Sequence, residues 1–385
     1  FRLLARILYA VCLSACDAKE PLPENRDAEI ESPVIANDLS NQKVTAIAED
    51  TQGHIWIGTF RGLNKNNVHD YHQYFCTDDS LGLPDNQITH LLRDSKNRFW
   101  VGTVNGVCLY TDKDNFRIIP IEADNKNVRQ ILEDRNGRIF LSTGFQLYAY
   151  HPREEKITCV LPEICTGNTF YAQCHIAPDN NLWVMTSTGL RCYDLSTLQL
   201  KESVALSGYP YYSYLHNNEL WITGNHTLSI FDTRTRSFKP LPQPIARNTT
   251  LCNADIDYIH PYGNNGLLLN TARHGMFYYN PGTGSVTRQG ENGFPFEMPR
   301  FRISRMFTDS QQNLWIGSVD QGYTVCYHYK ERFNNDNYLR SELNNKSVVS
   351  LSAGKDHKLW ISTLMDGIYV YDTKSSEIRH IDPET

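Results

Sequence analysis

Several features that are common in other protein classes are missing from this 385-residue sequence. It has 37 Lys and Arg against 43 Asp and Glu, a net charge of −6, so it lacks the basic excess of most nucleic-acid-binding proteins. Its ten cysteines include no C-x-x-C pair, which argues against a zinc site of the usual spacing. Neither H-E-x-x-H, G-x-S-x-G nor the D-x-D-x-D-G spacing of a calcium loop occurs. We therefore expect no metal, no cofactor, no bound nucleic acid and no enzymatic activity in this chain.

Long apolar runs are also scarce, and the main one lies at the start. Residues 1–16, FRLLARILYAVCLSAC, combine Arg2 and Arg6 with a short apolar stretch and small residues, which is the pattern of a secretory signal. The final LSAC also resembles a bacterial lipobox, which would place a lipid on Cys16; an ordinary signal peptide that contains a cysteine is the alternative. Residues 17–36 are charged and contain proline, as a linker would. No other segment is apolar enough to cross a membrane.

Helical periodicity is missing as well, whereas one strand-like repeat occurs eight times. The stretch HIWIGTFRGL (54–63) has close relatives at 98–107 and 313–322. The position of its tryptophan recurs every 38 to 47 residues, at Trp56, Trp100, Phe140, Trp183, Trp221, Leu268, Trp315 and Trp360. Apolar residues around it alternate with a period of two, so each repeat is predicted to form a four-stranded antiparallel sheet. Radial packing of such sheets gives a β-propeller.

The recurring residues have structural explanations. The tryptophan is large enough to fill the space between neighbouring sheets, and the small residue two positions later lets those sheets approach. The glycine that opens the third strand permits a turn with positive φ. The Glu-Asp pairs at the ends of first strands suggest acid–base chemistry, but they recur once per sheet beside a hairpin turn. We therefore expect them to support the hairpin.

The number of repeats leaves two arrangements open. Seven repeats, over residues 37–335, would close a seven-bladed β-propeller. The eighth, at 348–373, follows a polar spacer. We therefore expect residues 336–385 to begin a second propeller that the sequence does not complete. A single eight-bladed ring is the alternative.

The frame V-x-x-I-x-E-D-x-x-G-x-L-W-I-G-T-x-x-G-L-x-x-Y resembles the two-component regulator propeller repeat. The resemblance covers nearly the whole chain after the signal. It is good at 44–64, 88–110, 303–327 and 348–371, and weaker at 128–150 and 174–193. The repeats near 213 and 256 are degenerate. WD40 and kelch propellers have other signatures.

This resemblance implies the periplasmic sensor of a hybrid two-component regulator. In such proteins two tandem seven-bladed propellers precede a membrane helix, a histidine kinase and a DNA-binding region, and the sensor recognises oligosaccharides to control glycan-utilisation genes. The implied partners are an oligosaccharide, the second propeller of the same chain and a second copy in a homodimer. Membrane attachment would come from a downstream helix or from the lipid on Cys16. A propeller glycosidase, a polysaccharide lyase and a protein-interaction scaffold are the alternatives.

Candidate ligand-binding residues lie in the loops that share one face of a propeller. Aromatic rings stack on the C–H faces of sugars, and Arg or Asp side chains hydrogen-bond hydroxyl and acidic groups. Loops between second and third strands supply Arg61, Asn105, Arg273, His274, Asp320 and Asp366. Connections between repeats supply Tyr209, Tyr211, Tyr212, Phe296 and Arg300. The alternative for the aromatic residues is that they pack against the second propeller or under their own loops.

Overall fold

The computed structural model describes most of the chain after residue 38. It describes residues 39–66, 71–77, 82–111, 114–164, 173–206, 208–263, 265–298, 301–328, 342–343, 346–375 and 377–382. The predicted signal peptide (1–16) and linker (17–36) therefore lie outside the described residues. The chain divides into two compact units, one of residues 32–328 and the other containing residues 329–385.

The larger unit begins with four sheets of four antiparallel strands, which we number as blades. Blade 1 contains β1 (Val44–Glu49), β2 (Ile55–Thr59), β3 (Gly62–Asn66) and β4 (Tyr71–Tyr74). Blade 2 contains β5 (Ile88–Arg93), β6 (Phe99–Thr103), β7 (Gly106–Tyr110) and β8 (Phe116–Ile119). Blade 3 contains β9 (Gln130–Glu133), β10 (Ile139–Ser142), β11 (Leu147–His151) and β12 (Lys156–Leu161). Blade 4 contains β13 (Gln173–Ile176), β14 (Asn181–Thr186), β15 (Gly189–Asp194) and β16 (Leu200–Ala205).

Three further sheets complete this unit. Blade 5 contains β17 (Pro210–His216), β18 (Glu219–Gly224), β19 (Thr227–Asp232) and β20 (Ser237–Lys239). Two short helices, α2 (Gln243–Ala246) and α3 (Thr249–Cys252), connect it to blade 6. Blade 6 contains β21 (Ile256–Tyr262), β22 (Gly266–Thr271), β23 (Gly275–Asn280) and β24 (Ser285–Arg288). Blade 7 contains β25 (Ile303–Thr308), β26 (Leu314–Ser318) and β27 (Tyr323–Cys326), three strands within the described residues.

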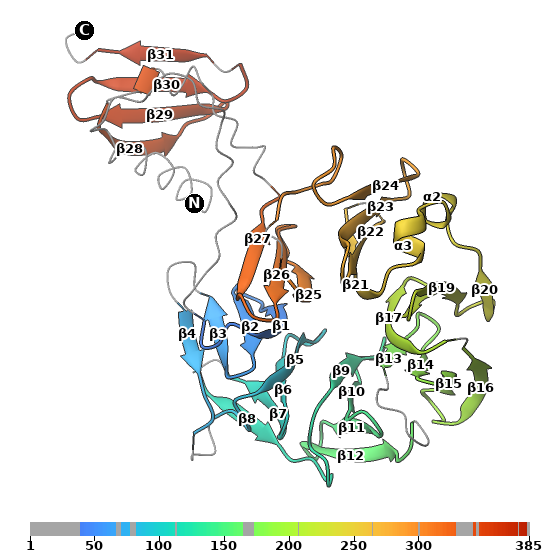
Figure 1. Ribbon diagram of the computed structural model, residues 1–385. Helices are drawn as coiled ribbons and strands as arrows, with labels where there is room; N and C mark the ends of the chain where they lie inside the picture. The colour runs from blue at the N-terminus through green and yellow to red at the C-terminus, as the bar shows by residue number, and fades with distance from the viewer. Residues whose placement is uncertain are drawn as a thin grey trace. The chain divides into compact units, whose positions relative to one another are not determined.

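The seven sheets form a closed ring (Figure 1). Their first strands, β1, β5, β9, β13, β17, β21 and β25, lie side by side in this order around the axis. Blade 7 returns to blade 1 through a backbone hydrogen bond of 2.8 Å from Gly322 N to Gln42 O. Glu49 of blade 1 also accepts bonds from the backbone nitrogen (2.8 Å) and hydroxyl (2.6 Å) of Ser310. The prediction of a seven-bladed propeller is thus confirmed, and the eight-bladed ring is excluded.

In blades 1, 2, 3 and 7, the Asp that follows the first strand accepts hydrogen bonds from the hairpin turn. In blade 1, Asp50 Oδ1 accepts from the backbone nitrogens of Gln52 and His54, while Oδ2 accepts from Trp56 Nε1 at 2.9 Å. Burial acts to raise the pKa of Asp50, but the hydrogen bonds from Trp56 and the backbone outweigh it and lower the pKa. The carboxylate therefore ties the hairpin turn to the indole. The aspartate thus supports the hairpin as predicted, whereas Glu49 bonds Ser310 of blade 7 instead of its own hairpin.

The tryptophan fills the space between blades, as its size predicts. Trp56 is fully buried and packs against Phe99 of blade 2, with ring centroids 5.0 Å apart. Gly58 explains the need for a small residue nearby, because a Cβ there would lie 2.5 Å from Cγ2 of Ile88. Gly62, which opens β3, has φ of 111°. Each of these positions is therefore constrained by packing or backbone geometry.

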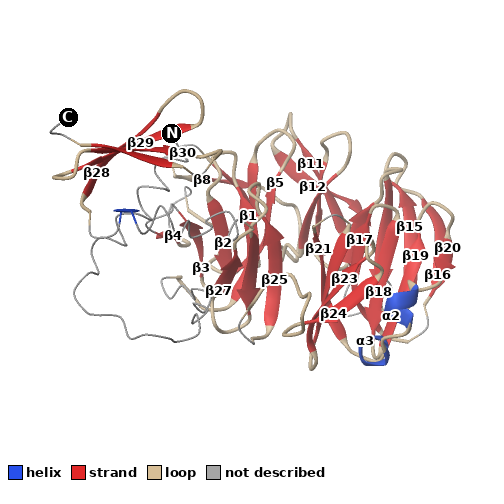
Figure 2. Cartoon of the chain, turned by 90° about the horizontal axis from the view of Figure 1, so that it is seen from above, coloured by secondary structure: helices blue, strands red, loops and turns tan. Residues whose placement is uncertain are grey.

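Blades 4, 5 and 6 depart from this arrangement. They have Ala177, Leu215 and Tyr262 six residues before the tryptophan position, where the other four have Asp. As a result, the buried indole nitrogens of Trp183 and Trp221 have no hydrogen-bond partner. Blade 6 also has Leu268 in place of tryptophan. The connections on this side are longer, and α2 and α3 lie beside blades 5 and 6 in Figure 2, which shows the ring edge-on.

The second unit contains the eighth repeat. It forms a four-stranded sheet of β28 (Val348–Ala353), β29 (Lys358–Thr363), β30 (Ile368–Asp372) and β31 (Ile378–Ile381). Trp360 is 40% exposed, whereas its counterpart Trp56 in the ring is fully buried. The repeat sequence therefore forms the sheet, but burial of its tryptophan requires a neighbouring sheet. That this unit begins a second propeller stays a prediction.

Candidate functional site

A hollow of about 680 Å³ lies between blades 6 and 7, and we call it the blade 6–7 hollow. The loop between β22 and β23, residues 271–275, forms one wall, and the end of β24 continues it through residues 288–291. The other walls come from Met298 and residues 301–303 before β25, and from Asp320 and Gln321 after β26. Asp257 and Asn270 also line it. All the loops in this set belong to one face of the ring, the face on which the candidate residues were predicted.

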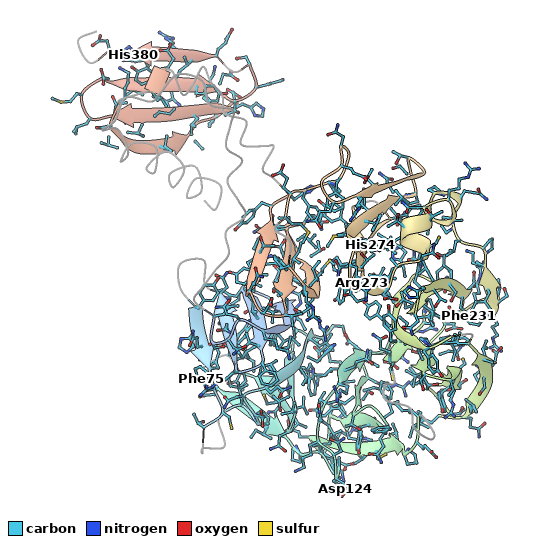
Figure 3. All side chains as sticks on the ribbon, in the orientation of Figure 1. Phe75, Asp124, Phe231, Arg273, His274 and His380 are labelled. Carbon is cyan, nitrogen blue, oxygen red and sulfur yellow. The ribbon has the colours of Figure 1, made fainter. Side chains whose placement is uncertain are left out.

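Two guanidinium groups face this hollow from different blades. Arg273 comes from the β22–β23 loop, and Arg302 comes from the connection into blade 7. Figure 3 shows Arg273 and His274 on the inner side of blade 6. Arg288 holds the β22–β23 loop, because its Nε donates to the backbone oxygen of His274 at 2.7 Å. This bond ties the β22–β23 loop to the end of β24, so two walls of the hollow are joined.

Asp257 is the acid on the axial side of the hollow. It accepts a hydrogen bond of 2.6 Å from Asn270 Nδ2. Partial burial of the carboxyl group, which removes water from it, raises the pKa of Asp257 above its ordinary value. The hydrogen bond from Asn270 and the charge of Arg302 act in the opposite direction. The residue as a whole still contacts solvent. Its carboxyl is thus easier to protonate than an ordinary surface aspartate.

The structure brings together only some of the predicted ligand-binding residues. Arg273, His274 and Asp320 line the blade 6–7 hollow. Arg61 and Asn105 lie in the corresponding loops of blades 1 and 2, and Asp366 belongs to the other unit. Arg300 lies outside the described residues.

Two of the four predicted aromatic residues, Tyr212 and Phe296, serve packing. The Tyr212 hydroxyl donates to Ile259 O of blade 6 at 3.3 Å, and its ring lies 5.4 Å from that of Tyr258. Phe296 packs edge-on against Tyr262 at 5.3 Å, within the cluster that includes Leu268. The long connection after blade 6 thus fills volume that a tryptophan supplies elsewhere. This is the packing alternative that the sequence left open.

Two tyrosines from the connection into blade 5 differ from this pattern. Tyr209 is 73% exposed and lines neither of the two cavities described for the ring. The Tyr211 hydroxyl is buried without a hydrogen-bond partner. Burial, together with the negative charges of Asp255 and Asp257, raises the pKa of Tyr211 to about 12. Tyr211 therefore lies near the axial side of the hollow without lining it.

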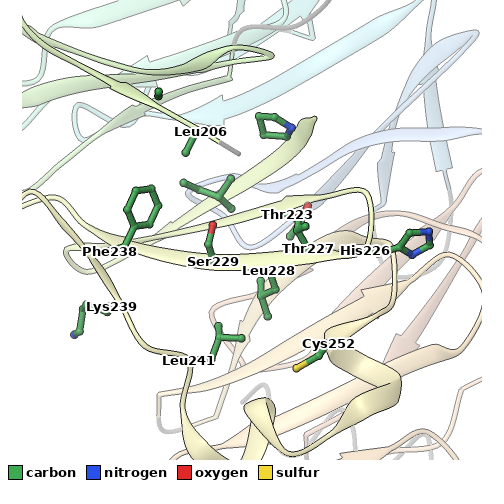
Figure 4. A pocket seen from close by; sticks show the side chains of 13 residues that line it. Leu206, Thr223, His226, Thr227, Leu228, Ser229, Phe238, Lys239, Leu241 and Cys252 are labelled. Atoms are coloured by element: carbon green, nitrogen blue, oxygen red, sulfur yellow. The ribbon is translucent and has the colours of Figure 1, made fainter. Parts of the chain in front are cut away.

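A second cavity, of about 580 Å³, surrounds the rim of blade 5 (Figure 4). Its lining includes Leu228 and Ser229, which are consecutive residues of β19 and point to opposite faces of the sheet. Ser229 and Phe238 lie on one side of the strand in Figure 4, and Leu228, Leu241 and Cys252 lie on the other. This cavity is therefore two shallow surfaces joined around an edge, and it is a weaker candidate than the hollow.

One side-chain pair resembles a nucleophile and its base. His175 Nε2 and the Ser213 hydroxyl are 2.8 Å apart. Ser213 is 1% exposed between blades 4 and 5, and burial lowers the pKa of His175 to about 4. Such a histidine is a weak base at neutral pH, and this serine is closed to substrate. The pair therefore joins two blades and does not form a catalytic site.

Sequence comparison identifies the repeats. The family model described as "Two component regulator propeller" matches residues 38–61 and 82–105. These two segments are similar to two-component regulator propeller repeats. The two matched segments contain β1, β2, β5 and β6 with the tryptophans and hairpin aspartates of blades 1 and 2. No protein of curated function matches the sequence.

Solved structures share the fold of these propeller repeats. An extracellular domain assigned to the hybrid two component system BT3049 of B. thetaiotaomicron has a TM-score of 0.62 at 21% identity. That match covers 89% of this chain and 48% of that one, so the chain spans about half of its length. Virginiamycin B lyase from Staphylococcus aureus has a TM-score of 0.56 at 14% identity, covering 74% of this chain and 94% of the lyase. At these identities the likeness establishes the propeller fold alone.

Two residues that line the blade 6–7 hollow were missed by the sequence analysis, because it searched the loops alone. Asp257 and Asn270 lie in strands β21 and β22, and the only signal for Asp257 is a charged residue within a first strand.

Within the described parts of the chain, no three His, Cys, Asp or Glu side chains are arranged to hold a metal ion. None of the helices among these residues is long and apolar enough to cross a bilayer.

Proposed function

We propose that the chain is the ligand-sensing module of an exported signalling protein and that it binds an oligosaccharide in the blade 6–7 hollow. The single observation that carries the proposal is the hollow itself, which gathers Arg273, His274 and Asp320 on one loop face. Its volume falls in the range of small-molecule sites, and its lining offers both donors and acceptors to hydroxyl groups.

The cellular role follows from the repeats and the N-terminal sequence. Propeller repeats of this type, a secretory signal over residues 1–16 and the likeness to an extracellular domain support a periplasmic location. In the longer protein that we infer, a membrane anchor, a kinase and a DNA-binding region transmit the signal to glycan-utilisation genes. The partners are then the oligosaccharide, the second propeller and a second copy of the chain.

A lyase or glycosidase is the competing function, because the fold is shared with a lyase. Such chemistry needs an acid and a base that converge on one bond. Of the residues that could serve, His274 and Asp320 line the hollow, whereas Tyr212 is engaged between blades and Asp366 is in the other unit. The arrangement therefore favours binding over catalysis.

Binding can be tested with the 385-residue chain on a glycan array, followed by calorimetry with each hit. We expect at least one oligosaccharide to bind, and Arg273→Ala to weaken it by tenfold or more, about 1.4 kcal/mol, because a charge-assisted contact is lost. Arg153→Ala is the control, since Arg153 is an exposed arginine in the turn between β11 and β12 and does not line the hollow. If the two variants bind the oligosaccharide with equal affinity, the blade 6–7 hollow is not its binding site. Turnover of a bound glycan would favour the enzyme.

A further inference from the structure

The acidic side chains of the blade 6–7 hollow are already engaged by their neighbours. Asp257 accepts from Asn270 at 2.6 Å, and Asp320 accepts from the Ser318 hydroxyl at 3.1 Å. Glu291 Oε2 accepts from the backbone nitrogen of Arg288 at 2.8 Å and so closes the turn after β24. These carboxylates therefore serve as acceptors for local donors, and each holds part of the wall in place.

The basic side chains are used differently. Arg288 is engaged through the His274 backbone oxygen. Arg273 and Arg302 have neither a hydrogen bond from the guanidinium group nor an ion pair with any described residue. Both are exposed, and they approach the hollow from two separate segments of the chain. Each carboxylate of the hollow thus has a donor among the described residues, whereas these two guanidinium groups have no acceptor there.

This imbalance selects among oligosaccharides. A guanidinium group presents five N–H donors in a planar fork that matches two oxygens of a carboxylate or sulfate. A neutral sugar offers hydroxyl groups, which accept hydrogen bonds from a guanidinium group but bring no negative charge to it. We infer that the ligand is an acidic oligosaccharide, bearing carboxylate or sulfate groups, and that Arg273 and Arg302 bind its acidic groups. This inference rests on the proposed function and narrows its ligand class.

The test compares acidic oligosaccharides with neutral counterparts of the same backbone. Trigalacturonic acid, trimannuronic acid and a sulfated galactan tetrasaccharide are titrated by calorimetry, each beside its carboxyl-reduced or desulfated form. We expect at least one acidic form to bind ten times more tightly than its neutral form, with an affinity that falls as salt increases. The three compounds also separate the carboxylate from the sulfate as the group that is bound.

Variants connect that preference to the hollow. Arg273→Ala with Arg302→Ala should remove the tenfold preference for the acidic form, whereas Arg153→Ala should keep it. Arg273→Lys with Arg302→Lys keeps both charges but not the fork, so it should retain only part of the preference.

The possible failures are distinguishable. If acidic and neutral forms bind equally and Arg273→Ala weakens both, the acidic ligand is wrong but the sugar site stands. If inorganic sulfate competes as strongly as a sulfated sugar of equal charge, the hollow binds anions and the sugar function fails. If none of these compounds binds and the array yields only a neutral oligosaccharide, the acidic ligand is wrong; if the array yields no oligosaccharide either, both proposals are overturned.

Discussion

The two sides of the ring solve the same packing problem with different chemistry. Blades 1, 2, 3 and 7 have an aspartate at the first hairpin, and opposite the tryptophan position they have apolar residues, Ala48, Leu92, Leu132 and Phe307. Blades 4, 5 and 6 lack that aspartate and have His175, Tyr214 and His260 opposite. His175 and His260 bond hydroxyl groups of the next blade, Ser213 at 2.8 Å and Thr308 at 2.9 Å. The regular side thus has a hairpin aspartate in each blade and exposed or half-buried polar bonds between blades, such as Ser310 to Glu49. The irregular side instead places buried histidines at its blade boundaries.

Removing a hairpin aspartate from the regular side should have the largest effect. The Asp94 side chain is fully buried and accepts from Trp100 Nε1 at 2.8 Å and Arg98 Nε at 2.7 Å. Asp94→Ala leaves both donors without their acceptor, so we expect the free energy of unfolding to fall by about 3–5 kcal/mol. Urea denaturation followed by tryptophan fluorescence measures the change. A loss below 1 kcal/mol would show that the aspartate is not what holds the regular blades.

Acid should destabilise the irregular side through His175 and His260, and blade 2 through His90, whose pKa burial also lowers to about 4. Burial lowers the pKa of His175 and of His260 to about 4, against 6.5 for an unperturbed histidine. The unfolded chain therefore binds protons that the folded chain does not, and stability is lost as the pH falls from 6.5 toward 4. Each histidine accounts for at most about 2 kcal/mol between pH 7 and 5.

The variant His175→Leu tests this origin, because leucine occupies the same position in blade 2. We expect it to reduce the pH dependence of unfolding between pH 7 and 5 by up to about 2 kcal/mol. His260→Leu makes the same change in blade 6 and should reduce the slope by a similar amount. If the slope is the same in all three proteins, the buried imidazoles are not its cause.

The comparison also predicts a stabilising substitution. Trp183 Nε1 is buried without a partner, and Ala177 occupies the position from which an aspartate reaches the indole in blades 1, 2 and 7. Ala177→Asp should supply that acceptor and raise the free energy of unfolding by about 1 kcal/mol. Ala177→Asn, which lacks the charge, should gain less. Destabilisation by the aspartate would mean that the blade 4 hairpin cannot adopt the regular geometry.

Sequence was sufficient for the ring because its restraints are local and repeated. Trp56 and Asp50 lie six residues apart, and both belong to one hairpin, so a periodic pattern reveals them. The blade 6–7 hollow is different, since Arg273 and Asp320 come from two repeats and are brought together only when the ring closes. The aromatic residues were harder still. An aromatic residue such as Phe296 could contact a sugar or pack in a core. The space that it fills arises because Leu268 is smaller than the tryptophan of other blades, and this space is defined only when the neighbouring blade is in place.

The smallest effect is expected where the irregular side faces solvent at the hollow. Arg273 is exposed and its guanidinium group has no hydrogen bond or ion pair with any described residue, so Arg273→Ala should change the free energy of unfolding by less than about 0.5 kcal/mol. Ligand binding should still fall by tenfold or more, since binding is where its donors are used. Unfolding and calorimetric titration of the same preparation separate the two effects. If the variant instead loses 2 kcal/mol or more of stability, Arg273 belongs to the framework of the ring, and its effect on affinity no longer identifies a binding residue.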